Sequence, residues 1–221
     1  TIPEAILNWP AHGNTARGEA RYIAPFHDTN NDGIYDPTDG HYHEFYISNT
    51  MPCDEKLLGD QMVYWILNDK GNSHSNSGGT PFGLEIHCMA YAYATDDALD
   101  NTTFIRYKII NRSATDYSDV YFGQLFDGDI GNNEDDFIGT DVERGMFFTY
   151  NGDNFDEDLN GNQGYQDDLA AIGIAYVRGA LAVPGDGIDN NHNGIVDEVN
   201  EEVHLSGTMA FANANQLPQQ E

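Results

Sequence analysis

An acidic stretch near the N-terminus constrains this chain more than any other part of its sequence. In residues 28–39, side chains with oxygen atoms occupy positions 1, 3, 5, 9 and 12, and Gly33 occupies position 6. This is the ligand order of an EF-hand-type calcium loop, with Asp instead of Glu at position 12. The candidate ligands are Asp28, Asn30, Asp32, Asp36 and Asp39, together with the backbone carbonyl of Ile34.

The spacing has a physical cause. A hard cation needs about six to eight oxygen ligands, and alternate residues of a tightly curled loop point inward. Glycine takes the sharp central turn most easily, because it has no Cβ. The stretch therefore predicts a calcium site, and the alternative is an acidic Asn/Gly-rich turn without a metal.

A second stretch repeats the pattern near the other end of the chain. Residues 189–197 again place oxygen atoms at positions 1, 3, 5 and 9 and a glycine, Gly194, at position 6. Asn200 would stand at position 12 and is a poor closing ligand, so Glu198 or Glu201 is expected to replace it. The candidate ligands are Asp189, Asn191, Asn193, the carbonyl of Ile195, Asp197 and Glu198.

Neither stretch has the flanking helices of a true EF-hand. Pro25 and Pro37 crowd the first loop, and Pro184 precedes the second. Both therefore look like isolated calcium loops of the dockerin or thrombospondin type-3 kind.

Two weaker acidic patterns raise the expected number of calcium ions from two to as many as four. The first follows an expected strand and contains Asp127, Asp129, Asp135 and Asp136. The second contains Asp156, Asp158 and Asn160 at positions 1, 3 and 5, with Gly161 at position 6. Dense like charges repel unless a cation gathers them, but a solvated acidic loop is the alternative in both places.

Histidine and cysteine offer less specific signals. His41 and His43 form an HxH pair that could bind zinc or copper, but the set is incomplete and solvated side chains are the favoured interpretation. Cys53 and Cys88 form either one disulfide or two buried thiols.

Charge excludes several classes of partner. The chain has 9 Lys and Arg against 37 Asp and Glu, a net charge of -28. Nucleic acid and anionic membranes are therefore disfavoured, because no basic patch exists to meet phosphates. Aromatic residues make up 12% of the chain, which argues against disorder. No run reaches the ~20 apolar residues of a membrane span.

Alternating apolar and polar residues predict an all-β fold, a β-sandwich or a jelly roll with long calcium-binding loops. We expect one structural domain overall, with a loop-rich segment at 1–61, the β-sandwich at 62–212 and a polar tail at 213–221. The expected strands are 62–67, 82–94, 102–111, 119–126, 145–151, 171–178 and 205–212.

Enzyme motifs are missing from the sequence. It contains no G-x-S-x-G elbow, H-E-x-x-H helix, P-loop or G-x-G-x-x-G turn. Pairs of carboxylates, which glycoside hydrolases use for catalysis, are weak evidence here because so acidic a chain offers many such pairs. We expect no enzymatic activity.

Several stretches resemble large secreted surface proteins that Bacteroidota-type bacteria export by the type IX secretion system. They are residues 9–13 with 24–37, residues 59–71, residues 104–113 through 122–131, residues 150–153 and the repeat at 186–190. The resemblance covers most of residues 9–200. It implies an extracellular, calcium-rich β domain within a longer protein, which fits a chain that begins at Thr1 without a signal peptide.

The sequence therefore predicts a calcium-stabilised structural or adhesive domain of a cell-surface or filament-forming protein. Its expected partners are other copies of itself or neighbouring domains of the same precursor, with the tail after residue 212 as a candidate contact. The alternative is a carbohydrate-binding or polysaccharide-hydrolase accessory module, which would use Trp9, Trp65, Tyr91 or Tyr93 as stacking platforms.

Overall fold

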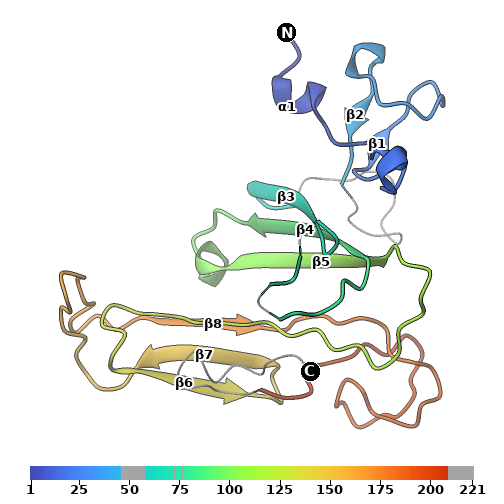
Figure 1. The fold of residues 1–221 in the computed structure, drawn as a ribbon. Helices are drawn as coiled ribbons and strands as arrows, with labels where there is room; N and C mark the ends of the chain where they lie inside the picture. Colours follow the sequence, from blue (N-terminus) through green and yellow to red (C-terminus); the bar gives the residue numbers. More distant parts are fainter. Residues whose placement is uncertain (46–57, 72, 76, 209–221) are drawn as a thin grey trace. The chain divides into compact units, whose positions relative to one another are not determined.

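The computed structural model describes residues 1–45, 58–71, 73–75 and 77–208 (Figure 1). The chain forms two compact units, Thr1–Ser118 and a second unit that starts at Asp119. Within the described ranges, no helix is long and apolar enough to cross a membrane.

The expectation of a β fold is confirmed, since the described residues form three small antiparallel sheets and almost no helix. The first unit contains, in order, α1 (Glu4–Leu7), η1 (Thr15–Arg17), β1 (Phe26–His27), η2 (Pro37–Asp39), β2 (Tyr42–His43), β3 (Gln61–Asn68), β4 (Leu84–Ala92), η3 (Ala98–Asn101) and β5 (Thr103–Asn111). The second contains β6 (Asp136–Asp141), β7 (Met146–Asn151) and β8 (Ala171–Ala175).

The main sheet of the first unit has the order β3-β4-β5. Its three strands are those expected at 62–67, 82–94 and 102–111, with ends that differ by one or two residues. The period-2 pattern predicted them well, because one face of each strand carries the side chains that pack against its neighbours. Trp65, Cys88 and Tyr107 lie opposite one another across this sheet.

The sheet of the second unit has the order β6-β7-β8. β7 and β8 confirm the strands expected at 145–151 and 171–178, although β8 ends at Ala175. β6 was not expected, because its acidic ends resemble the loop before it.

One expected strand is wrong. Residues 119–126 form no strand, although their aromatic and β-branched residues suit one. Asp119 has a φ of 54°, in the left-handed region that interrupts an extended chain, and Val120 and Tyr121 are 72% and 85% exposed. Of the strand expected at 205–212, residues 205–208 are not in a strand, and the rest lies outside the described residues.

Cys88 lies at the centre of β4 and is fully buried as a free thiol. Burial raises the pKa of this thiol, which keeps it protonated and unreactive. Cys53, its possible disulfide partner in the sequence, lies outside the described residues.

A buried polar network crosses the main sheet beside Cys88. Glu85 accepts hydrogen bonds from Arg112 at 2.7 Å and from the Nε2 of His87 at 2.8 Å. The other ring nitrogen of His87 contacts the hydroxyl of Tyr64. Burial by itself raises the pKa of Glu85, but the bonds from Arg112 and His87 hold that pKa below its ordinary value.

We expect Glu85→Gln to lower the free energy of unfolding of the first unit by about 1–3 kcal/mol, because it removes a charge that two donors share. A depressed carboxyl pKa stabilises the fold above the ordinary value of 4.5, and this stabilisation is lost as pH falls through the folded-state pKa. Urea denaturation at pH 7 and pH 3 measures both effects.

The matched control is Glu44→Gln, which removes the carboxylate of the more exposed His27–Glu44 pair. It should change stability by less than about 1 kcal/mol. An equal loss in both variants, or a Glu85 effect that does not shrink at low pH, would contradict the role of the buried network.

Candidate metal centre

The first acidic loop curls around the carboxylate of Asp28. Its Oδ1 accepts the N–H of Asp32 at 3.3 Å, and its Oδ2 accepts the N–H of Gly33 at 2.7 Å. Asn30 accepts the same N–H of Asp32 at 3.1 Å, and Asp32 accepts the N–H of Ile34 at 2.8 Å. The side chains at positions 1, 3 and 5 therefore face the inside of the loop.

Two residues with positive φ make this curl possible. Asn31 has a φ of 59°, and Gly33 has a φ of 71°. Asparagine and glycine tolerate the left-handed region better than other residues, which explains their use at positions 4 and 6.

The second loop has the same hydrogen bonds at the same positions. Asp189 accepts the N–H groups of Asn193 at 3.1 Å and Gly194 at 2.8 Å. Asn191 accepts the N–H of Asn193 at 3.1 Å, and Asn193 accepts the N–H of Ile195 at 2.8 Å.

The backbone of the second loop also agrees with that of the first. His192 at position 4 has a φ of 59° and Gly194 at position 6 has a φ of 90°. Two segments in different compact units therefore adopt the same loop conformation.

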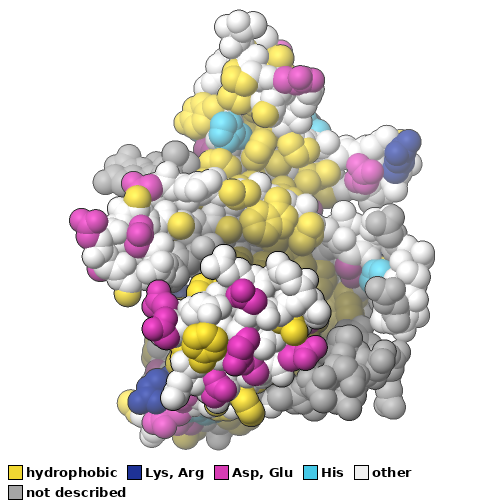
Figure 2. Space-filling view, turned by 90° about the vertical axis from the view of Figure 1, so that its left-hand side faces the viewer, with side chains coloured by type: hydrophobic (Ala, Val, Ile, Leu, Met, Phe, Trp, Pro, Cys, Tyr) yellow, Lys and Arg dark blue, Asp and Glu magenta, His cyan; other side chains and the backbone are white. Residues whose placement is uncertain are grey.

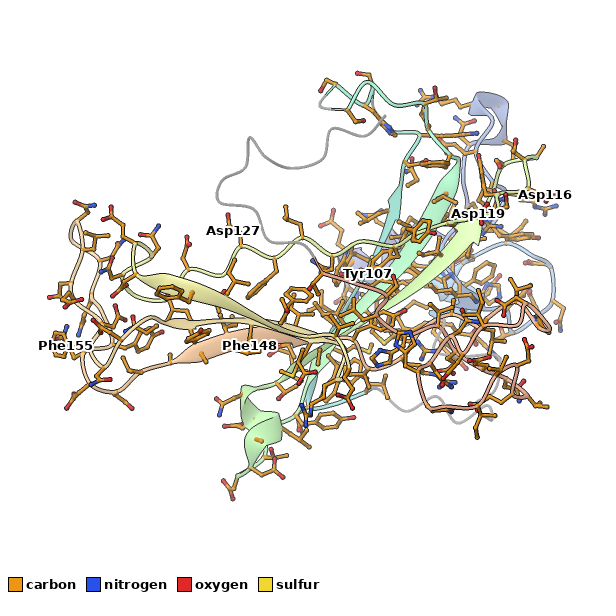
Figure 3. The ribbon with its side chains drawn as sticks, turned by 90° about the horizontal axis from the view of Figure 1, so that it is seen from below. Tyr107, Asp116, Asp119, Asp127, Phe148 and Phe155 are labelled. Carbon is orange, nitrogen blue, oxygen red and sulfur yellow. The ribbon has the colours of Figure 1, made fainter. Side chains whose placement is uncertain are left out.

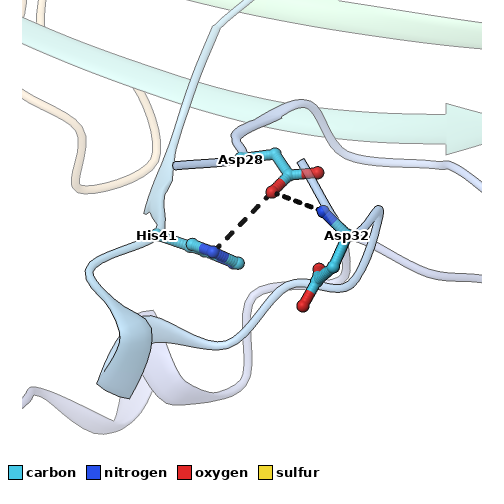
Figure 4. Close-up of side chains that lie close together, drawn as sticks. All are labelled: Asp28, Asp32 and His41. Atoms are coloured by element: carbon cyan, nitrogen blue, oxygen red, sulfur yellow. Dashed lines mark hydrogen bonds and ion pairs between the residues drawn. The ribbon is translucent and has the colours of Figure 1, made fainter. Parts of the chain in front are cut away.

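Two side chains of the first loop and one from just beyond it gather at the spacing of a metal site. Asp28, Asp32 and His41 each offer one ligand atom, and these atoms lie within 4.8 Å of one another (Figure 4). Burial works against the charge of Asp28, but the N–H groups of Gly33, Asn31 and Asp32 hold its pKa below the ordinary value. Asp28 is therefore a carboxylate at neutral pH.

His41 directly precedes β2 and is almost completely buried. Its Nδ1 accepts the N–H of Asp36 at 3.1 Å, so the neutral ring carries its proton on Nε2. Nε2 faces Asp28 Oδ1 at 3.7 Å, too far for a hydrogen bond, and has no hydrogen-bond partner. A protonated nitrogen cannot ligate a metal, so His41 orients Asp28, as residues around a metal site commonly do.

The remaining expected ligands of the first loop make other contacts. Asp36 accepts the N–H and hydroxyl of Thr38, and so caps η2. These bonds lower the pKa of Asp36. Asp39 ends η2, where its backbone carbonyl accepts a bond from Thr29. Ile34 is exposed, as is Ile195 in the second loop.

The structure distinguishes the two glutamates of the second loop. Glu198 accepts the side-chain N–H groups of Asn191 at 2.8 Å and Asn193 at 2.9 Å, so its carboxylate lies beside positions 3 and 5. Glu201 instead accepts the backbone N–H groups of Asn190 and Asn191. Asp197 accepts the N–H of Gly187 and so holds the start of the loop.

The two weaker patterns differ from these loops. Asp158 accepts the N–H of Gly164 and the side chain of Gln166, and the positive φ values fall on Asn160 and Gly161. Asp127 and Asp129 are exposed, whereas Asp135 and Asp136 are partly buried. Asp156 is fully buried.

His43 does not join His41. It packs against Trp9 with ring centroids 5.1 Å apart. The role of His41 was missed in the sequence, because it lies beyond position 12 of the loop. Its spacing from Asp28 gave no signal by itself.

Comparison with known proteins found no matching family model, no matching curated protein and no matching solved structure. The candidate site is therefore interpreted from its own geometry.

We expect nuclear magnetic resonance of the ring nitrogens, recorded at a pH where the His41 ring is neutral, to show its proton on Nε2. His12 is an internal control with the opposite arrangement, since its Nε2 accepts the N–H of Tyr35 and its Nδ1 faces the carbonyl of Arg21. A proton on Nδ1 of His41 would contradict the orienting role and make Nε2 a ligand.

Proposed function

We propose that this chain is a calcium-stabilised structural or adhesive domain that works outside the cell, within a cell-surface or filament-forming protein. The observation that supports this proposal most directly is the shared conformation of the two loops. In both, the aspartate at position 1, Asp28 or Asp189, accepts the N–H of the glycine at position 6.

The donors favour calcium over other metals. The inward side chains of both loops offer carboxylate and amide oxygens, which suit a hard cation. Zinc and copper prefer nitrogen and sulfur. At the first loop, the ring nitrogen that faces Asp28 is His41 Nε2, which carries the proton of the neutral ring. Magnesium demands a smaller, near-octahedral set, which a flexible loop supplies less readily.

The charge of the chain supports a structural role for the ions. A net charge of -28 opposes a compact state, and Figure 2 shows acidic side chains at many places on the face it presents, with Lys and Arg at few. An ion that binds only the folded loop adds its binding free energy to folding. Each compact unit contains one of the two loops.

The main sheet supports the adhesive part of the proposal. Val63, Leu67, Ile105 and Ile109 share one face of β3-β4-β5 and are between 47% and 54% exposed. Apolar sheet faces are normally covered by a second layer. The sandwich or jelly-roll packing predicted from the sequence would cover this face, and a neighbouring domain or a second copy is the partner we propose. The tail at 213–221 lies outside the described residues.

The location follows from the expected affinity and the resemblance. Isolated loops of this kind bind calcium at about 10⁻⁴–10⁻³ M in extracellular modules, so they need an extracellular supply. The stretches that resemble type IX secreted surface proteins support the same location.

The carbohydrate alternative has less support. Tyr91 stacks on Phe104 at 5.2 Å and meets Tyr93 edge-on at 6.0 Å, so these rings use their faces for packing. Trp9 lines a cavity of about 170 Å³ with His43, Phe45 and Tyr64, which is smaller than the ~300–1,000 Å³ of most ligand pockets.

We expect calcium at 100 times its dissociation constant to stabilise each unit by about 2.7 kcal/mol. Asp32→Ala should remove this gain from the first unit only, and Asp189→Ala should remove from the second unit only the part that its own loop contributes. Hydrogen exchange measured unit by unit, with calcium and with excess chelator, separates the two effects.

The control variants are Asp116→Asn and Asp168→Asn, which remove exposed acids outside the loops. Both should keep the calcium response of the parent chain. If chelator leaves the exchange of both units unchanged, the proposed function is wrong.

A further inference from the structure

Carboxylates from the two weaker acidic patterns meet in the second unit. Asp136 stands at the start of β6, and its electrostatic neighbours are Asp135, Asp156 and Asp129. The loop between them fits closely. Ile130 donates its N–H to Asp136 Oδ2 at 2.8 Å, and Asn132 donates its N–H to Asp156 Oδ1 at 2.8 Å.

The close packing of this loop against Asp156 depends on Gly131. A Cβ at Gly131 would lie 1.9 Å from Asp156 Oδ2, and the residue has a φ of 50°. Asp156 is completely buried. Figure 3 shows its neighbour Phe155 among the loops at one end of the β6-β7-β8 sheet.

Three oxygen atoms in this region are buried without a hydrogen-bond partner. They are Asp135 Oδ1, Asp136 Oδ1 and Asn151 Oδ1. An unpartnered buried oxygen costs about 1–3 kcal/mol, so three neighbouring ones indicate a missing positive partner.

Asn151 is the most informative of the three. It is 7% exposed and lies directly opposite Asp136 across β6 and β7, so both side chains are on one face of the sheet. Its Nδ2 donates to the carbonyls of Asp153 and Phe155 at 3.3 Å. This anchors the amide and leaves Oδ1 buried without a hydrogen-bond partner, on the face of the sheet that Asp136 shares. An amide oxygen is a ligand for a hard cation.

The second unit has no base to neutralise this group. Its Lys and Arg side chains are only Arg144 and Arg178, since the sequence has no lysine after Lys108, and among the described residues no hydrogen bond links its two histidines, His192 and His204, to these carboxylates. Arg144 is paired with Asp141 and Arg178 with Glu202. Burial, followed by the charges of Asp135, Asp156 and Asp129, raises the pKa of Asp136 despite its bond from Ile130.

We propose that Asp135, Asp136, Asn151 and Asp156 form a third cation site, for a calcium-type divalent ion, that is independent of the two loops. Asp129 adds charge at its exposed side. Among the described residues, these carboxylates are not gathered within 4.8 Å of one another as the donors around Asp28 are, so a bound ion would draw them together. Water completes the six to eight oxygens that calcium takes.

Calorimetric titration of the full chain with calcium chloride tests this site. The titrated protein is a double variant of the full chain, in which Asp28→Asn and Asp189→Asn disable the two loops. This double variant should still bind one equivalent of calcium, and Asp136→Asn added to it should weaken that binding at least tenfold. If the loops do not bind calcium, the double variant matches the parent chain, so the two proposals fail separately.

Stability without calcium supplies the second readout. Asn at 136 keeps an oxygen for the N–H of Ile130 but removes a repelling charge, so Asp136→Asn should stabilise the calcium-free second unit and destabilise the calcium-loaded one. Asn151→Asp should bind calcium more tightly and be less stable without it. Glu143→Gln, an exposed acid of the same unit, is the control and should change neither.

Two results would overturn the third site. One is a double variant without any bound calcium in the second unit. The other is a loss of stability in Asp136→Asn that is equal with and without calcium, which would assign Asp136 a structural role only.

Discussion

The hydrogen bond from a backbone N–H to an aspartate oxygen is the interaction on which the rest of this structure depends. Asp28 and Asp189 gather the N–H groups of their loops, Asp69 accepts those of Gly83 and Leu84 between β3 and β4, and Asp156 holds the loop at Asn132. Such charged bonds are stronger than neutral ones. They order long loops around a core whose buried apolar residues are few among the described positions.

Local patterns predicted the two loops because their bonds join residues only two to five positions apart. The strands of the main sheet were equally readable, since alternation reports which face of a strand is buried. Residues 119–126 show the limit of that rule. Their composition suits a strand, but a strand also needs a neighbour and continuous extended backbone, and Asp119 interrupts it.

Long-range contacts were beyond the sequence patterns. His41 orients Asp28 only because β1 and β2 pair and return the chain to the loop. Asp136 and Asp156 belong to separate motifs in the sequence, and the register of β6 with β7 places Asn151 opposite Asp136. A search for repeated spacings has no means of finding a ligand set of this kind, because its members share a place in space rather than a period.

The division of the two similar loops between two compact units has a mechanical consequence. If each loop closes around its own ion, each unit resists extension by itself. A chain pulled along its length would then lengthen in separate steps, one unit yielding while the other stays folded. Tension would be dissipated in stages, and a unit that refolds around calcium would restore its length without the other having opened.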